Sequence, residues 1–157
     1  MKKPKRLSPT ELPLAFEIDP EPVTEIWTAR AGIPLLVEAS RRLGVPESIN
    51  RNLKLKQRDR GFDEATMVES FIILNAAGGE CLDDFQVLRE DKGLSELIGH
   101  PIPSPAAARK FLYQFHDQQS IDEARQQLLP GHTAFIPGEN EALAGLGESN
   151  RELILKV

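Results

Sequence analysis

The chain has 157 residues, of which 40% are hydrophobic and 27% charged, and its net charge is −5. This composition is that of an ordinary globular protein and excludes a collagen-like, mucin-like or wholly disordered chain. The longest apolar run, residues 71–74, is far shorter than the roughly 20 residues needed to cross a bilayer, so we expect no membrane partner.

The N-terminus and the cysteine content indicate a compartment. The basic start, Met1–Arg6, is followed by polar residues and prolines rather than by an apolar segment, so no secretory signal is expected. Cys81 is the single cysteine, which permits neither an internal disulfide nor a Cys-based zinc site. Both features fit a reducing compartment and predict a cytoplasmic protein.

The charge is unevenly distributed along the chain. Residues 1–60 carry twelve Lys and Arg against eight Asp and Glu, whereas residues 61–157 carry seven against sixteen. A net negative charge argues against binding to a polyanion, because such binding depends on clustered cations. Local clustering matters more than the total, so the basic first part keeps nucleic acid among the candidate partners.

Proline content divides the chain into three parts. Residues 1–30 contain five prolines and predict a proline-rich arm, in which the alternating segment Val23–Ala29 favours one short strand. Residues 31–130 predict a compact helical domain. Residues 131–157 predict a linker followed by a C-terminal helix that begins near Glu139. The fold class is therefore all-α, with at most that one strand.

Helical periodicity is strong from Gly32 onward. A first helix is predicted to end at Gly44 and to bury apolar residues that recur at helical spacing. These residues are Leu35, Leu36, Ala39 and Leu43. A second helix covers about Pro46–Leu53.

Asp63 is predicted to cap a third helix that runs to about Ala77. Its apolar residues predict one buried face, with polar residues on the opposite face. The predicted buried residues are Val68, Phe71 and Ile72, and the opposite ones are Thr66, Glu69 and Ser70.

Short helices follow the third helix, and they are separated by turn residues. The predicted ranges are Leu82–Glu90, Leu94–Ile98, a Ser104-capped helix from Pro105 to about Phe115, and Ile121–Leu129.

The basic stretch Arg51–Gly61 is the first candidate for phosphate contacts. An extended backbone would place the cations at alternate positions, Lys54, Lys56, Arg58 and Arg60, on one side. The candidate residues are Arg51, Lys54, Lys56, Arg58 and Arg60. The alternative interpretation is a solvated linker that charge keeps soluble.

The helix after Ser104 is the second candidate. At about 100° per residue, Ala108, Phe111, Leu112 and Phe115 share an apolar face. The opposite face carries two cations, a phenol and an amide, which are groups that contact phosphates and base edges. These residues are Arg109, Lys110, Tyr113 and Gln114. The pattern predicts a helix-turn-helix-like segment with this helix in a DNA groove, and its alternative is an ordinary amphipathic surface helix.

The remaining chemistry-bearing residues favour structural roles. Asp83 and Asp84 are adjacent in a predicted first turn, where carboxylates stabilise a helix, so capping is the favoured interpretation. The histidines, His100, His116 and His132, have no recognised metal-ligand spacing and are predicted to be structural or surface residues. We assign no metal site and no catalytic residue.

Several segments also occur in a characteristic order. They are Thr28–Ala39 with Arg41–Gly44, Arg60–Phe62, Ala77–Asp91, Pro103–Leu112 and Phe135–Gly147. Together they resemble the N-terminal region of bacterial insertion-sequence transposases of the DDE type, the IS-thirteen-eighty group. The resemblance extends from about residue 28 to the end of the chain and is most specific over Gly78–Asp91 and Pro103–Leu112.

The resemblance implies a division of functions. In that family a helical N-terminal region precedes an RNase H-like core, whose three carboxylates bind two divalent metals such as Mg²⁺ for strand cleavage. The chain ends at Val157, before the pattern reaches those carboxylates, so no cofactor, no catalytic residue and no cleavage by this chain alone are expected. The implied function is recognition of double-stranded DNA at terminal inverted repeats, at the nucleoid.

A helical dimerisation module without DNA recognition is the alternative. In the C-terminal helix a 3-4-3-4 spacing relates Leu143, Leu146, Asn150, Leu153 and Val157. Such a spacing occurs in helices that pair, and a polar residue within it can fix the register. The same stripe could instead dock onto the expected catalytic core.

Overall fold

The computed structural model describes residues 25–55, 61–126 and 140–156. This part of the chain contains eight α-helices and no strand, which confirms the all-α class. The segment proposed as a strand lies partly outside the described residues, and its described part, residues 25–29, belongs to no helix or strand. None of the described helices combines the length and the apolar character that crossing a bilayer requires.

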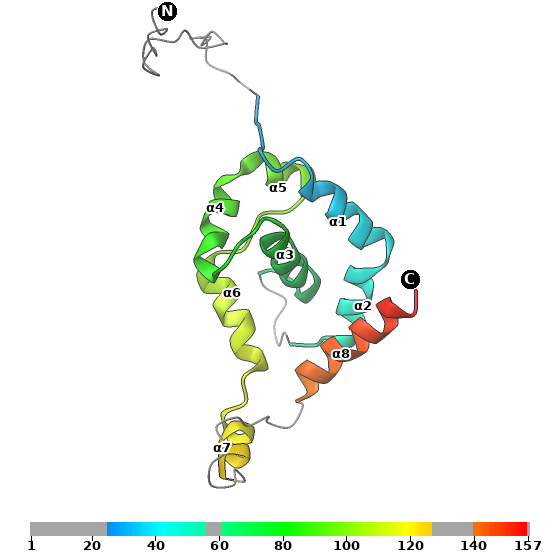
Figure 1. Ribbon diagram of the computed structural model, residues 1–157, viewed down its shortest axis with the longest axis vertical. Coiled ribbons are helices and arrows are strands. Elements are labelled where there is room, and N and C mark those ends of the chain that lie inside the picture. The colour runs from blue at the N-terminus through cyan, green and yellow to red at the C-terminus, as the bar shows by residue number, and fades with distance from the viewer. Residues whose placement is uncertain (1–24, 56–60, 127–139, 157) are drawn as a thin grey trace, which may run out of the picture.

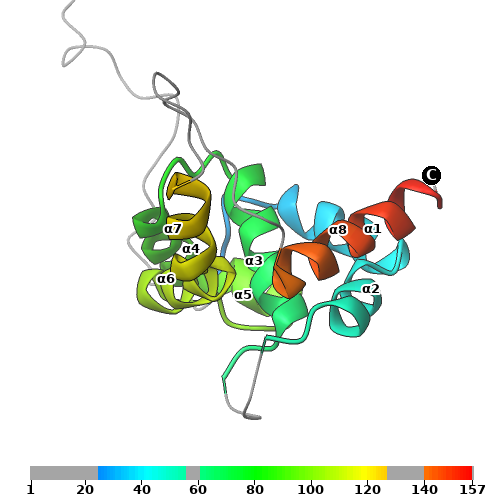
Figure 2. The same ribbon diagram turned by 90° about the horizontal axis from the view of Figure 1, so that it is seen from below.

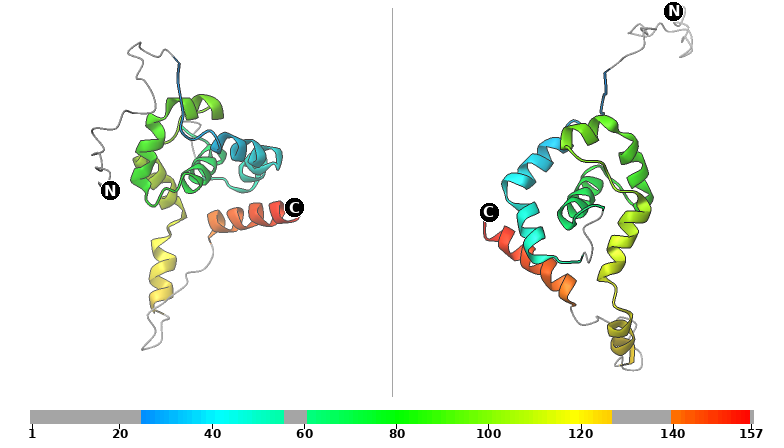
Figure 3. Two further views of the ribbon diagram at one scale, coloured as in Figure 1. Left: turned by 45° about the horizontal axis from the view of Figure 1, so that its top comes forward. Right: turned by 180° about the vertical axis from the view of Figure 1, so that it is seen from behind.

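The helix α3 (Glu64–Ala76) occupies the centre of the molecule (Figure 1). Around it lie five helices, which are α1 (Ile33–Arg42), α2 (Val45–Asn52), α4 (Phe85–Glu90), α5 (Lys92–Ile98) and α6 (Pro105–Leu112). The helix α7 (Gln118–Gln126) stands away from this ring at one end, as the rear view in Figure 3 also shows.

The central position of α3 explains why its predicted faces are wrong. Glu69 and Ser70, expected opposite the buried face, are buried with 5% and 0% of their surface exposed. Val68, Phe71 and Ile72, expected to be buried, are only half-buried. A helix surrounded by others has no solvent side, so its burial does not follow its own amphipathic pattern.

The predicted buried face of α1 is also wrong. Leu35 is 74% exposed, and the stripe that packs inward consists of Ile33, Val37 and Ser40. Because the helix already begins at Ile33, its sequence contains two sets of residues at helical spacing. Packing against α3 and α5 buries the set that includes Ile33.

Several helix starts follow the predicted capping chemistry. The Asp63 carboxylate accepts a hydrogen bond from the Thr66 amide at 2.7 Å, and the Ser104 hydroxyl accepts one from the Ala107 amide at 3.2 Å. Asp84 caps the short 3-10 helix η2 (Leu82–Asp84) by accepting from the Cys81 amide at 3.0 Å. These bonds satisfy amide donors that have no partner within the helix.

The helix α8 (Glu141–Ile154) lies against α2 (Val45–Asn52), on the side of the molecule away from α4 and α6 (Figure 2). A Cβ atom on Gly145 would lie 2.3 Å from the Asn52 carbonyl oxygen, so glycine permits the close approach of the two helices. The Ser149 hydroxyl donates to the Ser48 carbonyl at 3.2 Å. The packed face is therefore built from small residues.

The predicted leucine stripe of α8 is displaced from this packed face. Leu143 and Leu146 are 39% and 36% exposed, whereas Ala142 and Ser149 are buried. Leu153 is half-buried and Asn150 is exposed, while Val157 lies outside the described residues.

The segment before α1 is attached to α5. The Thr28 hydroxyl and the Arg30 guanidinium both donate to one oxygen of Asp91, at 2.7 and 3.0 Å. The other oxygen of Asp91 accepts from the Leu94 amide at the start of α5. A Cβ on Gly93 would lie 2.7 Å from the Trp27 carbonyl oxygen, so the segment crosses α5 in direct backbone contact.

Candidate nucleic-acid interface

The helix α6 and the 3-10 helix η3 (Tyr113–Phe115) that continues it are anchored by aromatic side chains. Phe111 is 8% exposed, and its ring centroid lies 6.1 Å from that of Phe71 on α3 and 5.4 Å from that of Phe115. Phe71 in turn makes an edge contact with Phe85 of α4 at 5.2 Å. These contacts fix the orientation of α6 on the domain.

The opposite face of α6 and η3 is open to solvent. Arg109, Lys110, Tyr113 and Gln114 are all exposed, as predicted. Leu112, predicted on the apolar face, is 44% exposed because it lies at the edge of that face. The structure therefore presents the four candidate side chains together on one surface.

This surface has two flanks, since residues four apart on a helix share a side. On one flank, Arg109 lies 4.0 Å from Asp83 of η2, and both side chains are largely exposed. On the other flank, Lys110 and Gln114 line a groove that also contains Leu55, Phe62 and the acidic residues Asp63 and Glu64. An exposed ion pair of this kind contributes at most about 1 kcal/mol, so it leaves the guanidinium of Arg109 available to a stronger anion.

Only part of the basic stretch lies beside α6. Lys54 and Gln114 line one cavity, together with the acidic residues Asp117 and Glu141, and this cavity joins the start of the basic stretch to the exposed face of η3. Lys54 also donates to the Asn50 carbonyl. Arg51 does not line this cavity and pairs with Glu152 of α8 at 3.2 Å. Lys56, Arg58 and Arg60 lie outside the described residues.

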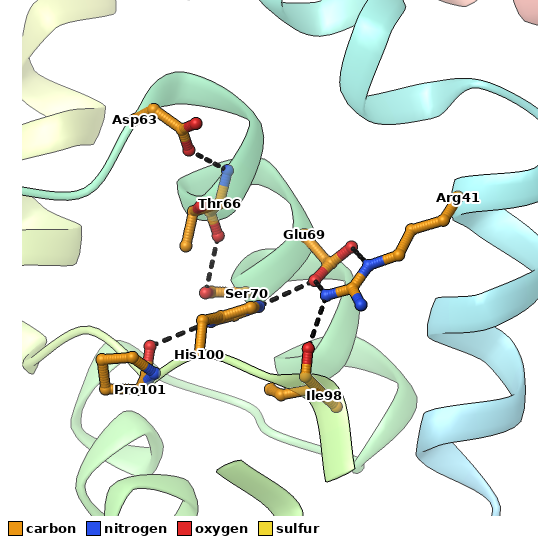
Figure 4. Close-up of polar contacts among 8 residues, drawn as sticks. All are labelled: Arg41, Asp63, Thr66, Glu69, Ser70, Ile98, His100 and Pro101. Carbon is orange, nitrogen blue, oxygen red and sulfur yellow. Dashed lines mark hydrogen bonds and ion pairs between the residues drawn. The ribbon is translucent and has the colours of Figure 1, made fainter. Parts of the chain in front are cut away.

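A second set of polar residues, the buried cluster, is centred on Glu69 and connects α3 with α1 and with the turn after α5 (Figure 4). Glu69 of α3 accepts two hydrogen bonds from Arg41 of α1, from Nε at 3.0 Å and from Nη2 at 2.7 Å. The same Nη2 donates to the carbonyl of Ile98, the last residue of α5, at 2.7 Å. His100 Nε2 lies 2.7 Å from Glu69 Oε1, and its Nδ1 lies 3.0 Å from the Pro101 carbonyl oxygen.

The charges in this cluster stabilise one another. Burial alone would raise the pKa of Glu69, but the hydrogen bonds from His100 and Arg41, together with the positive charge of Arg41, lower it below its ordinary value. The hydrogen bond to Glu69 raises the pKa of His100 and outweighs the opposing effect of burial. The arrangement therefore favours a carboxylate between two cations.

Sequence reasoning missed this cluster. His100 was assigned a structural or surface role without a partner, and Glu69 was placed on the polar face of α3. A signal was present, because apolar residues occur all around α3, and a carboxylate on a helix buried on all sides needs cationic partners. The partners themselves are far apart in sequence, so no local pattern identifies them.

No family model, curated protein or solved structure matches this chain. Within the described ranges, no group of three or more His, Cys, Asp and Glu side chains is arranged to hold a metal ion.

Proposed function

We propose that this chain binds double-stranded DNA through the exposed face of α6 and η3. The observation that carries the proposal is the two-sided character of this element. One side is fixed to the core by Phe111, and the other presents Arg109, Lys110, Tyr113 and Gln114 to solvent. A rigid helix with cationic and amide donors on its outer face has the chemistry needed to enter a major groove.

Different residues of the face have different roles in this proposal. Arg109 and Lys110 contact phosphates along the groove, while Tyr113 and Gln114 reach base edges. Ala106, which is exposed in the first turn, allows that turn to approach the duplex closely. In this arrangement α5, the turn after it and α6 form a helix-turn-helix-like unit with α6 as the recognition helix.

Lys54 extends the proposed interface beyond α6. It lines the same cavity as Gln114, so a duplex seated on α6 would pass close to this cation. Arg51 is left out of the proposed contact because it reaches Glu152 of α8 and does not line the cavity that Lys54 shares with Gln114. The basic stretch therefore contributes through its residues after α2.

The resemblance to insertion-sequence transposases supports a specific target, the terminal inverted repeats of such an element. In the proposed mechanism the helical domain holds and positions the DNA end. Strand cleavage with divalent metal belongs to the RNase H-like core of that family, and no residue of this chain is assigned to it.

A binding titration with an Arg109→Ala/Lys110→Ala variant tests the proposal. We expect fluorescence anisotropy to show at least about tenfold weaker binding to a repeat-containing duplex, and a slope against salt reduced by about two, because two phosphate contacts are lost. The matched control is Arg42→Ala/Arg151→Ala, which removes the same charge from exposed positions on α1 and α8. Equal losses in both variants would contradict the assignment to α6.

Dimerisation through α8 is a second candidate, favoured by its exposed leucines. Leu146 and Leu153 line an apolar groove with Val45 of α2 and Ile72 of α3. Light scattering during size-exclusion chromatography distinguishes the candidates. A wild-type protein that is dimeric and binds no duplex, together with a monomeric Leu146→Glu variant, would favour dimerisation over DNA recognition.

A further inference from the structure

The turn between α5 and α6 is held at one point by the buried cluster. His100 directly follows Gly99, which ends α5 with a φ of 80°, a left-handed conformation suited to glycine. Beyond His100, Ile102 is 3% exposed and Pro103 is fully buried, and the next residue, Ser104, caps α6. A short, packed segment therefore connects His100 to the first turn of α6, so a shift of His100 would move that turn.

The surroundings of the His100 ring select its doubly protonated form. Nε2 faces a carboxylate oxygen of Glu69 and Nδ1 faces the carbonyl oxygen of Pro101, and neither oxygen can donate a hydrogen. A neutral imidazole has only one N–H, so it can make just one of these two bonds. The loss of the proton would set a nitrogen lone pair against an oxygen.

We infer that His100 is a pH-sensitive positioning residue, whose protonated ring fixes the start of α6 on α3 and thereby strengthens DNA binding by the α6 surface. This inference rests on the proposed function. His100 touches no DNA in this arrangement. It acts through Glu69 and through the turn that leads to Ser104.

The charges around His100 set the direction of the effect. Among the described residues, those acting on it are Glu69 from α3, which favours the proton, and Arg41 from α1, which opposes it. The net result is a raised pKa of His100. The protonated ring therefore holds the start of α6 fully below the ordinary histidine pKa of about 6.5, and this effect is lost as the pH rises through the raised pKa. DNA affinity should therefore fall as the pH rises through the raised pKa of His100.

The first experiment measures DNA affinity between pH 6 and pH 8.5 at constant salt. We expect the wild type to weaken about fivefold over this range, a coupling at the lower end of those known between sites. The variant His100→Gln should bind weakly throughout and lose this pH dependence. The matched control, His116→Gln, removes an exposed imidazole and should keep it. An equal pH dependence in wild type and His100→Gln would overturn the inference.

The second experiment follows α6 without DNA. Tyr113 is the single tyrosine of the chain and lies in η3, so the NMR signals of ring-¹³C tyrosine report on this position alone. The Tyr113 ring contacts that of His116, with centroids 6.3 Å apart, so the titration is recorded in the His116→Gln background. We expect a pH-dependent shift that disappears when His100→Gln is added. A shift that persists would overturn the inference.

The two experiments separate the possible failures. If no duplex binds any variant, the proposed function fails, and the DNA part of the inference fails with it, even where the Tyr113 shift depends on His100. If His100→Gln does not fold, the His116→Gln protein decides the question through the ring ¹⁵N shifts of His100. Two protonated ring nitrogens at pH 6, with a midpoint shared by Tyr113, support the inference. A neutral His100 ring at pH 6 contradicts it.

Discussion

Two polar clusters of the molecule use similar residue types in opposite ways. Around the buried side chain of Glu69, the donors of Arg41 and His100 converge on its carboxylate and on two backbone carbonyls. On the surface of α6, Arg109 has an acidic neighbour only at 4.0 Å. Buried charges need close partners, whereas exposed donors are satisfied by water and can exchange it for a ligand. The contrast assigns the inner cluster to the fold and supports the binding role that we propose for the outer one.

The sharpest way to break the inner cluster is Glu69→Ala. Removing the carboxylate leaves Arg41 and His100 facing each other without a counter-charge. We expect the free energy of unfolding to fall by about 3 kcal/mol. This is the low end of the range for a broken buried pair, because the Arg41 side chain is 38% exposed. Urea unfolding followed by circular dichroism measures this loss. The control is Glu38→Ala, which breaks an exposed pair on α1 and should cost less than about 0.5 kcal/mol.

The pH dependence of unfolding gives the same cluster a second signature. Because the pKa of Glu69 is lowered by folding, its carboxylate stabilises the folded state at pH values above the ordinary pKa of a glutamate. This stability is lost as the pH falls through the lowered pKa. The raised pKa of His100 provides stability that is lost as the pH rises through it. The contribution of the cluster should be greatest between about pH 4.5 and 6.5. A difference between wild type and Glu69→Ala that is the same at pH 5.5 and pH 8.5 would contradict this assignment.

An intermediate effect is expected at the cap that connects the two clusters. Ser104→Ala removes the acceptor for the Ala107 amide at the start of α6 and should cost about 1 kcal/mol of unfolding free energy. We also expect weaker DNA binding, because the first turn of the proposed recognition helix loosens. Thermal unfolding and anisotropy titrations on the same samples measure both effects. Ser104→Asp restores an acceptor and should recover most of the loss.

The outer face should tolerate substitution almost without cost to the fold. Tyr113→Ala/Gln114→Ala removes two exposed side chains, so the free energy of unfolding should change by less than about 0.5 kcal/mol. Discrimination between the terminal repeat and random duplex should fall, because these residues are assigned to base edges. Competition binding measures it. Unchanged discrimination would remove these residues from the readout of sequence.

The smallest change in stability is expected for Lys54→Ala. Its exposed ammonium should affect unfolding negligibly, yet the salt dependence of DNA binding should decrease by about one phosphate contact. Anisotropy titrations at several salt concentrations determine the slope. Arg51→Ala is the comparison, because Arg51 does not line the cavity that Lys54 shares with Gln114 and its loss should leave the slope unchanged.

Local features of this fold could be predicted from sequence, and tertiary ones could not. The caps at Asp63 and Ser104 depend on amides three residues away, so the pattern contains both partners. The exposed face of α6 followed from its own periodicity, because that helix has one solvent side. The buried stripe of α1 depended on where α3 and α5 lie, and Leu35 shows that apolar spacing alone does not decide it.

The candidate sites show the same limit. Arg109 and Lys110 were found because they are neighbours on one helix. Arg41 and His100 are 28 and 31 residues from Glu69, so only the folded chain brings them together. The association of Lys54 with Gln114 likewise depends on the packing of separate segments. DNA recognition and the resemblance to transposases stay predictions.

The crossing of the N-terminal segment over Gly93 has a spectroscopic consequence. Trp27 is the single tryptophan of the chain, and although its backbone rests on α5, its side chain is 73% exposed. The folded protein should already emit like an indole in water, so denaturation should barely change the emission maximum. The same indole, remote in sequence from α6, offers a quenching assay for ligands that dock at the α5 end of the domain.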